Sequence, residues 1–416
     1  HVSNNLRLQS DEGGTGNIIH NDNLNITGTA KVEQYLAATN QSYNWHYVTL
    51  PVQNATADVF PSVKQDVSGD ATEETVYAAY YSEADQEYKY VISASDALDA
   101  NTGYAVPASS ATTIEFSGSL TPHSTQSSSS LSYATSGTYQ GFHLIGNPFT
   151  AAVDLSQLTS SAGTNWTEDI WVMHDGNFET YNVASSTGSF SVLPPMQAFW
   201  IRTDAAGGSF DLDPVNLVNN SQELYKDAES NKLRLRVKHK DYEDKLVVYL
   251  DERATNGMEK YDTEKRFAPD DNYPQIYTLA GDRKLAINGM EPLEEGMRHV
   301  TMGFEAAYAG TFTLQATNME SFKTASSVML RDNNTGKTIN LRKQGSYTFS
   351  TDAAVEQPER FTLILAADEA TGFEAPKESG ARMWVNNRSL YIQGAETAEA
   401  SMQLLDITGK VVRRET

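Results

Sequence analysis

Short runs in which hydrophobic and polar residues alternate fill the second half of the chain. Each run has roughly four to eight residues and is bounded by turn-forming residues, the pattern of strands in an antiparallel sheet. Examples are "NKLRLRVKHK", "DKLVVYLDE", "GTFTLQATN" and "RFTLILAAD". Between two such runs, "DNNTGK" (Asp332–Lys337) has the Asn, Asp and Gly content of a tight hairpin. We therefore predict an antiparallel β-sandwich for residues 216–368.

The first half repeats itself. "NWHYVTLPV" (Asn44–Val52) superposes without gaps on "GFHLIGNPF" (Gly141–Phe149), and an aromatic-rich hairpin pattern follows each copy. A third pair of segments places Gly103 on Ala198 and Tyr104 on Phe199. These matches predict an acidic β domain over residues 31–215, built of two related units at about 31–120 and 137–215. The Ser-rich stretch between the units is typical of a flexible connection.

The whole chain is predicted to be all-β and multidomain. Tyr, Phe and Trp are plentiful, whereas helical periodicity is scarce. Residues 1–30 alternate weakly and are expected to continue the strands and turns of an upstream region. Residues 369–380 are polar and predict a linker, and residues 381–416 predict a short C-terminal β segment.

The tripeptide Gly146-Asn147-Pro148 interrupts the apolar strand of the second repeat. Only the proline recurs in the first repeat, as Pro51. A ligand-binding loop should keep its polar atoms in both copies, whereas the end of a strand needs only the proline. We predict a structural corner, with an unusual backbone conformation at Gly146 or Asn147.

Charge divides the chain unevenly. The net charge is −23, and residues 1–215 carry 5 Lys and Arg against 23 Asp and Glu, while residues 216–416 carry 26 against 31. This step supports a domain boundary near residue 215 and argues against a nucleic-acid partner, because the first half would repel phosphates. No apolar run is long enough to predict a transmembrane segment.

The sequence contains no motif for catalysis. The absence of cysteine excludes disulfides, thiolate chemistry and Cys-ligated zinc. Neither Gly-x-Ser-x-Gly nor a phosphate-binding glycine loop occurs. We therefore assign no catalytic and no cofactor-binding residue and predict a non-catalytic protein. A structural calcium ion fits the composition, but no EF-hand spacing places its ligands among the acidic pairs. These pairs are Glu73/Glu74, Glu168/Asp169, Asp251/Glu252 and Asp270/Asp271.

Two further features have a functional and a structural interpretation. His46 and His143 occupy the same position in the two repeats. They could bind a metal or another ligand, or they could be histidines packed within a strand, and we favour packing. The aromatic residues of the two hairpins would suit sugar stacking, but aromatic residues on strands more often form core or cross-strand pairs, which we favour. They are Tyr77, Tyr80, Tyr81, Tyr88, Tyr90, Trp171, Phe178 and Tyr181.

The C-terminal residues resemble a known family. "LLDITGKVV" (Leu404–Val412), which follows "WVNNRSLYIQG", resembles the beginning of the sorting domain of Bacteroidetes proteins exported by the type IX secretion system. The blocks "NWHYVTLPV", "GFHLIGNPFTAAVDL" and "LPPMQAFWI" resemble the region that precedes this domain in large Bacteroidetes surface proteins of adhesin type.

The resemblance implies a protein at the extracellular or outer-membrane surface of a Gram-negative bacterium. We expect a non-catalytic adhesin-like protein that binds an extracellular ligand, either a glycan or a host protein. The alternative is a carbohydrate-binding accessory region of a secreted hydrolase whose catalytic part lies upstream.

Overall fold

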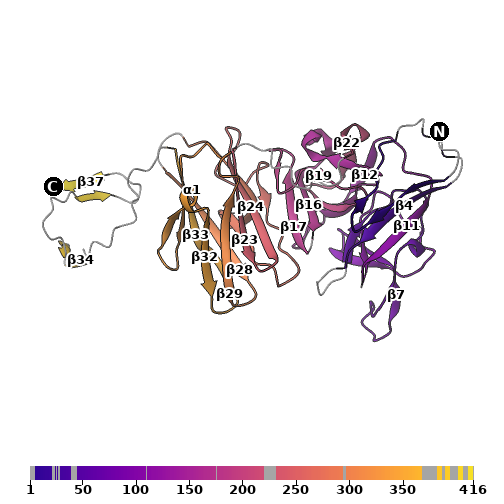
Figure 1. The fold of residues 1–416 in the computed structure, drawn as a ribbon, viewed down its shortest axis with the longest axis horizontal. Coiled ribbons are helices and arrows are strands. Elements are labelled where there is room, and N and C mark those ends of the chain that lie inside the picture. The colour runs from indigo at the N-terminus through magenta and orange to yellow at the C-terminus, as the bar shows by residue number, and fades with distance from the viewer. Residues whose placement is uncertain are drawn as a thin grey trace. The chain divides into compact units, whose positions relative to one another are not determined.

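The computed structural model describes residues 5–20, 24, 26, 29–38, 45–108, 110–174, 176–219, 231–293 and 297–367, and the backbone of four strands beyond them. Its regular structure is almost entirely β, which confirms the predicted all-β fold (Figure 1). The only α-helix among these residues, α1 (Leu341–Gln344), has four residues. None of the described helices has the length and apolar character required to cross a membrane. Contacts divide the chain into a unit of residues 1–368 and a unit of residues 369–416.

Two sheets with the same strand order form the centre of the repeats. We call the parts of the chain that carry them repeat one and repeat two. In repeat one the order is β5-β10-β8-β9, and in repeat two it is β13-β20-β16-β17-β18. The strands of repeat one are β5 (Trp45–Val48), β10 (Tyr104–Pro107), β8 (Ala78–Ser82) and β9 (Glu87–Val91). Those of repeat two are β13 (Phe142–Gly146), β20 (Ala198–Thr203), β16 (Trp166–His174), β17 (Asn177–Asn182) and β18 (Thr187–Gly188).

A smaller sheet accompanies each of these. In repeat one, β4 (Ala30–Leu36) pairs with β11 (Thr112–Gly118) and, in parallel, with β1 (Leu6–Leu8). In repeat two, β12 (Gln126–Leu131) and β15 (Gly163–Thr164) pair with β21 (Gly208–Leu212). The Ser-rich stretch is therefore not the flexible connection that its composition predicts. It supplies an edge strand, and an edge strand tolerates polar side chains because much of it remains exposed.

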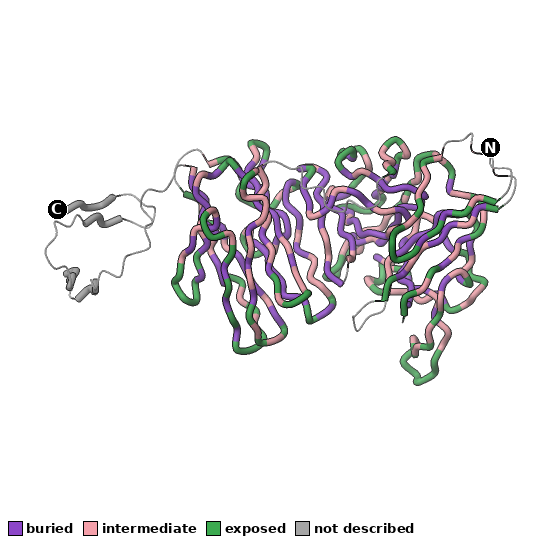
Figure 2. Tube along the Cα trace, viewed as in Figure 1, coloured by how far each residue is buried: buried purple, intermediate pink, exposed green. Residues whose placement is uncertain are grey.

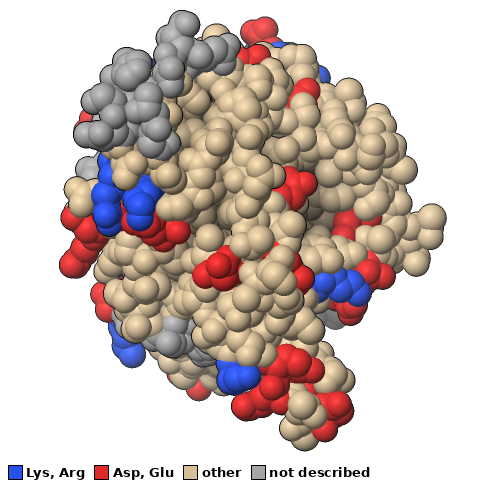
Figure 3. Space-filling view, turned by 90° about the vertical axis from the view of Figure 1, so that its right-hand side faces the viewer, with Lys and Arg blue, Asp and Glu red and all other residues tan. Residues whose placement is uncertain are grey.

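The remaining elements of the two repeats are short. They are the strand pairs β2 (Ser10–Asp11) with β3 (Gly14–Thr15) and β6 (Val63–Gln65) with β7 (Glu74–Val76), the small sheet of β14 (Ala152–Asp154), β19 (Val192–Leu193) and β22 (Leu217–Val218), and the 3₁₀ turns Ala57–Val59, Leu155–Gln157, Ser160–Ala162 and Pro214–Asn216. The β6–β7 hairpin projects from repeat one (Figure 1). Acidic side chains gather on it, and they outnumber basic ones on the face shown in Figure 3.

The two repeats contact each other through equivalent residues. Isolated antiparallel bridges join Val48 to Gln197 and Ile145 to Thr102. Between them, Gly146 lies against Thr49, the residue at the same position of the other repeat: a Cβ atom at Gly146 would be 2.2 Å from the Thr49 Cβ.

The Gly-Asn-Pro corner is structural, but the expected backbone conformation is wrong. Neither Gly146 nor Asn147 has a positive φ. Gly146 is needed for space, because any side chain would collide with Thr49. Asn147 is fully buried. Its amide donates to the carbonyls of Ala151 (3.0 Å) and Pro194 (2.9 Å), so the side chain fastens the turn.

One sheet of eleven strands forms the sandwich. Its order is β31-β30-β33-β28-β26-β27-β24-β23-β29-β32, with β25 beside β27. All its pairs are antiparallel except β24 with β27, which is parallel. The bounds are β23 (Lys232–His239), β24 (Tyr242–Leu250), β25 (Thr263–Glu264), β26 (Gln275–Ala280), β27 (Arg283–Met290), β28 (Met297–Ala306), β29 (Gly310–Thr317), β30 (Ser327–Asp332), β31 (Thr338–Asn340), β32 (Ser346–Thr351) and β33 (Val355–Ala366).

The sheet closes over its own core. Phe304 on β28 packs edge-on against Phe312 on β29 and Phe349 on β32, with ring centroids 4.9 Å apart in both pairs. These strands lie in different halves of the strand order, so the sheet must curl back to bring them together. Buried residues alternate with less buried ones along β29 and β32 (Figure 2), and the buried hydrophobic ones belong to this core.

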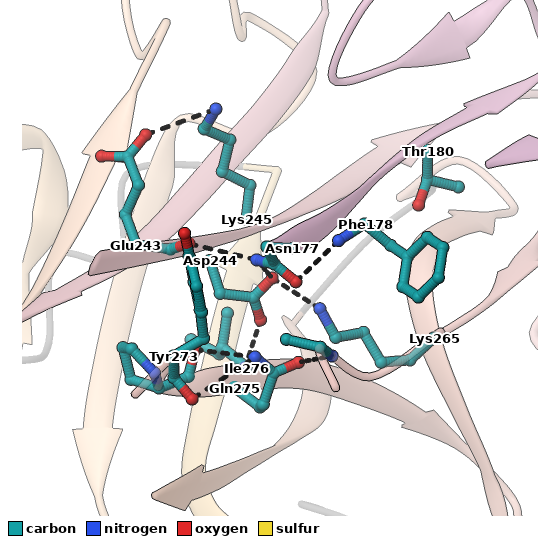
Figure 4. Close-up of polar contacts among 12 residues, drawn as sticks. Asn177, Phe178, Thr180, Glu243, Asp244, Lys245, Lys265, Tyr273, Gln275 and Ile276 are labelled. Atoms are coloured by element: carbon teal, nitrogen blue, oxygen red, sulfur yellow. Dashed lines mark hydrogen bonds and ion pairs between the residues drawn. The ribbon is translucent and has the colours of Figure 1, made fainter. Parts of the chain in front are cut away.

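A long connection between β24 and β26, residues 251–274, reaches repeat two; we call it the arm. A buried polar cluster anchors it (Figure 4). The Lys265 ammonium lies 2.5 Å from Asp244 Oδ1, and both side chains are 1% exposed. Asn177, in the β16–β17 hairpin, donates from Nδ2 to the same carboxylate at 2.9 Å, and the Ile276 amide donates to its other oxygen at 2.7 Å. The carboxylate is thus fully paired, as a buried charge requires.

The described residues of the second unit form two strand pairs. β34 (Arg382–Asn386) pairs with β35 (Ser389–Gln393), and β36 (Met402–Leu405) pairs with β37 (Val411–Glu415), both antiparallel. The predicted linker 369–380 lies outside the described residues.

Candidate functional site

A groove crosses the outer face of the repeat-one sheet because of the order of side-chain sizes along one cross-strand row. Tyr47 faces Ala105, Ala105 faces Ala79, and Ala79 faces Tyr90 in register. Directly opposed residues lie on the same face of a sheet, so two large side chains flank two methyl groups. The side chains at the two ends of the row therefore project further from the sheet than the two in its middle.

The opposite face of this sheet packs against the hydrophobic core of repeat one. Val48, Tyr104, Val106, Ala78 and Val91 are buried there. Because side chains alternate between faces along a strand, Trp45 and Tyr47 on β5 and Tyr88 and Tyr90 on β9 must lie on the outer face. The hydrophobic core thus fixes which aromatic residues the outer face presents.

The groove has a volume of about 370 Å³, within the range of small-molecule sites. Nine residues line it, from repeat one, from β16 of repeat two and from the arm. They are Trp45, Tyr47, Gln65, Ala79, Tyr88, Tyr90, Ala105, Met173 and Pro269. Trp45, Tyr47, Tyr88 and Tyr90 are half-buried, so part of each ring remains accessible. Aromatic walls with an alanine floor suit a flat, partly apolar ligand.

Polar atoms in the groove are uncharged. The hydroxyl oxygens of Tyr47 and Tyr88 lie 2.6 Å apart, and Gln65 Nε2 donates to the Tyr90 hydroxyl at 3.4 Å. No Asp, Glu, Lys or Arg is among the nine lining residues. Burial raises the pKa of Tyr47 and of Tyr88, so both phenols stay protonated. The site can therefore offer ring faces and neutral hydrogen-bonding groups.

Repeat two has a ridge where repeat one has this groove. The equivalent row there is Leu144, Trp200, Trp171 and Thr180. The two alanines are replaced by Trp200 and Trp171, each 1% exposed. In repeat two the large side chains therefore lie in the middle of the row, whereas in repeat one they lie at its ends.

The arm covers the ridge. The Arg266 guanidinium carbon lies 4.0 Å from the Trp200 ring centroid and 4.7 Å from that of Phe142, a cation–π arrangement. Trp171 Nε1 donates to the Glu264 carbonyl at 3.2 Å. Burial lowers the pKa of Arg266. The outer face of repeat two is thus an internal contact surface.

A charged cleft of about 490 Å³ lies between repeat two and the arm. Its carboxylates include Asp169 and Asp262, and burial raises the pKa of each to about 7. Asp169 Oδ1 accepts hydrogen bonds from the Asn182 amide at 2.9 Å and from the Thr263 hydroxyl. Arg202 lies 3.2 Å from Glu264 across the cleft. These contacts hold the arm to repeat two.

The histidines singled out by the sequence lie in the two repeat sheets. His143 Nε2 lies 3.0 Å from the Ser132 carbonyl, and burial lowers the pKa of both His46 and His143. Neither histidine lines the groove. Within the described ranges, no group of three or more His, Asp or Glu side chains is arranged to hold a metal ion.

The aromatic residues of the two hairpins lie in four environments. Trp171 and Tyr181 are buried, Tyr80 is 40% exposed outside the groove, and Tyr88 and Tyr90 line it. Tyr77 packs against the repeat-one core, whereas Tyr81 and Phe178 pack against the cluster around Trp200.

Sequence reasoning missed Trp45 and Tyr47 as groove residues. Their alternation with core-facing Val48 was the available signal, but only the strand pairing places them beside Tyr90.

These observations define a class of protein: an all-β chain with two related units, a curled sandwich and an aromatic groove. Residues 211–365 match the model of a family described as a domain of unknown function (DUF8693). The match spans the sandwich. No curated protein and no solved structure matches the chain.

Proposed function

We propose that this chain is a non-catalytic, adhesin-like binding protein and that the groove of repeat one binds a neutral glycan. The observation that carries the proposal is the row Tyr47–Ala105–Ala79–Tyr90, with Trp45 beside it. A sugar ring has an apolar face that stacks on aromatic rings and hydroxyls that bond to neutral polar groups, and the groove supplies both.

Charge supports a neutral ligand. None of the lining residues is ionised, so an acidic or a basic ligand would lose hydration without gaining an ion pair. The excess of acidic residues in the first half of the chain further disfavours polyanions.

In this proposal the rest of the chain holds the binding groove away from the cell surface. Successive β modules, each with a hydrophobic core of its own, are suited to holding a binding surface away from a cell. The resemblance of the C-terminal residues to a type IX sorting domain supports an extracellular or outer-membrane location in a Gram-negative bacterium.

The alternative is an accessory carbohydrate-binding region of a secreted hydrolase. The same groove would then hold the polysaccharide for a catalytic domain upstream of His1. Sequencing upstream separates the two: a glycosidase domain favours the hydrolase, and a long β repeat favours the adhesin.

The binding experiment is a glycan array followed by calorimetry with neutral plant and mucin oligosaccharides. We expect Trp45→Ala and Tyr90→Ala to weaken binding by about tenfold or more, which corresponds to roughly 1.4 kcal/mol for each stacked ring. Tyr80→Ala is the matched control, because Tyr80 is an exposed tyrosine on the neighbouring strand β8 that does not line the groove.

Equal affinities for the wild type and Trp45→Ala would overturn the assignment of the groove. The absence of binding to any neutral glycan would overturn the proposed ligand class.

A further inference from the structure

A third cavity lies at the end of the arm, on the sandwich. Its volume is about 320 Å³, and three carboxylates line it: Asp270, Asp271 and Glu305. Gln275, Ala306 and Ala307 also line it. We call it the acidic pocket. It is separate from the aromatic groove, although Pro269, the residue before Asp270, belongs to the wall of that groove.

Asp270 has one carboxylate oxygen that is hydrogen-bonded and one that is not. Its Oδ1 accepts hydrogen bonds from the Asn272 backbone amide at 2.9 Å and from the Asn272 side-chain amide at 2.8 Å. The residue is only 5% exposed, and Oδ2 is buried without a hydrogen-bond partner among the described residues. A buried carboxylate oxygen without a partner is costly, and a bound water or cation is one way to satisfy it.

Local charges leave this carboxylate uncompensated. Glu305 is already neutralised, because its Oε1 accepts from Lys284 Nζ at 2.6 Å and from the Tyr277 hydroxyl at 2.8 Å. Asp270 and Asp271 form no ion pair within the described residues. Two adjacent acidic side chains, the buried Asp270 and the exposed Asp271, therefore line the pocket, and no cation among the described residues pairs with either of them.

We propose that the acidic pocket binds a calcium ion through Asp270 Oδ2 and the Asp271 carboxylate. Oxygen ligands without His or Cys suit a hard cation, and calcium tolerates irregular geometry better than magnesium. Because no group of three carboxylates in the described residues can hold a metal, backbone carbonyls and water must complete the coordination. Few charged ligands give weak binding, so we expect a Kd of roughly 10⁻⁴–10⁻³ M, which is typical of extracellular modules.

The ion would order the segment that connects both sites. Asp270 follows Pro269 of the groove wall, and Arg266, four residues earlier, packs on Trp200. Calcium binding therefore fixes the position of Pro269 and, with it, the wall of the groove to which Pro269 belongs. This coupling rests on the proposed glycan binding, whereas the ion site itself does not.

The test uses the whole chain after removal of divalent ions with EDTA. We expect calorimetry to show one calcium ion bound, with thermal stabilisation by about 10 mM calcium that exceeds stabilisation by the same concentration of magnesium. Tb³⁺, a calcium substitute, should give luminescence sensitised by nearby tyrosines such as Tyr273. Asp270→Asn and Asp271→Asn should each weaken calcium binding at least about tenfold.

Asp282→Asn is the matched control, because Asp282 is an exposed aspartate on the same sandwich and outside the pocket. It should bind calcium like the wild type. Calcium binding that survives Asp271→Asn unchanged, or no calcium-dependent change in Tm, would overturn the site. If glycan affinity is the same with calcium and with EDTA while calcium binds, the coupling is wrong and the ion site stands.

Discussion

The two repeats share a strand order but present opposite surfaces. The row across repeat one reads Tyr47, Ala105, Ala79 and Tyr90, and the equivalent row across repeat two reads Leu144, Trp200, Trp171 and Thr180. Small residues in the middle leave a groove, whereas tryptophans in the middle fill it and add a ridge. The same backbone thus becomes a candidate ligand site in one copy and a docking face in the other.

The difference lies in what covers each face. The arm packs Arg266 on the repeat-two ridge and contributes only Pro269 to the rim of the repeat-one groove. A duplicated unit has two outer faces to use, and here one face stabilises the assembly of the modules while the other remains partly accessible.

The largest effect is expected from truncating the ridge. Trp200→Ala should lower the free energy of unfolding by about 3–5 kcal/mol, because it removes a fully buried ring from between Tyr47, Tyr81, Tyr88 and Arg266. Trp45→Ala, in the groove, should cost much less, because that side chain is half-buried. Urea denaturation of both variants measures the difference, and equal losses would contradict the assignment of ridge and groove.

A somewhat smaller effect is expected from pH at the contact of the arm with repeat two. Burial raises the pKa of Asp169 from 3.8 to about 7. Between about pH 4 and 7 the folded state therefore holds a proton on Asp169 that the unfolded state has released, so the contribution of Asp169 to stability falls as pH rises through this window and is constant on either side. The shift corresponds to up to roughly 4 kcal/mol.

Asp169→Asn should remove this share of the pH dependence, since an amide does not titrate. The measurement is the difference between wild-type and variant Tm at several pH values from about 4 to 8. Asp204→Asn, an exposed carboxylate of the same cleft, is the control. A constant difference between wild type and Asp169→Asn over this range would show that Asp169 keeps an ordinary pKa.

The smallest effect is expected where the repeats touch. Gly146→Ala should lower stability by about 1–3 kcal/mol, because the new methyl group would overlap Thr49. Adding Thr49→Gly removes the overlapping atoms and should recover part of the loss, which a double-mutant cycle would detect. Additive losses in the double variant would mean that the two residues do not meet.

The sequence predicts much of the fold because alternation and aromatic content are local signals. The all-β class and the superposition of residues 44–52 on 141–149 need no tertiary information. Cross-strand register does need tertiary information. Tyr47 and Tyr90 are 43 residues apart in the sequence, and only strand pairing through Ala105 and Ala79 makes them walls of one groove. The Gly146 prediction failed for a related reason, because the residue that excludes a side chain there comes from the other repeat.

The sites depend still more on tertiary contacts. Asp270 is one of many acidic residues in the sequence, and what distinguishes it is burial with an unused oxygen. Arg266 likewise gives no sequence signal, although it lies on the rings of Trp200 and Phe142. Side-chain environments of this kind arise from packing between modules, which periodicity does not encode.

The bridges between the repeats have an evolutionary consequence. Val48 pairs with Gln197 and Ile145 pairs with Thr102, so each repeat offers the other the same two positions. Such reciprocity defines an isologous interface, the kind that joins two identical subunits about a two-fold axis. In a homodimer the central position would bear the same residue twice, and two threonines would collide there. Fusion into a single polypeptide allows Thr49 on one side and Gly146 on the other, so the chain retains the symmetry of a dimer together with a close contact that identical subunits bearing threonine could not make.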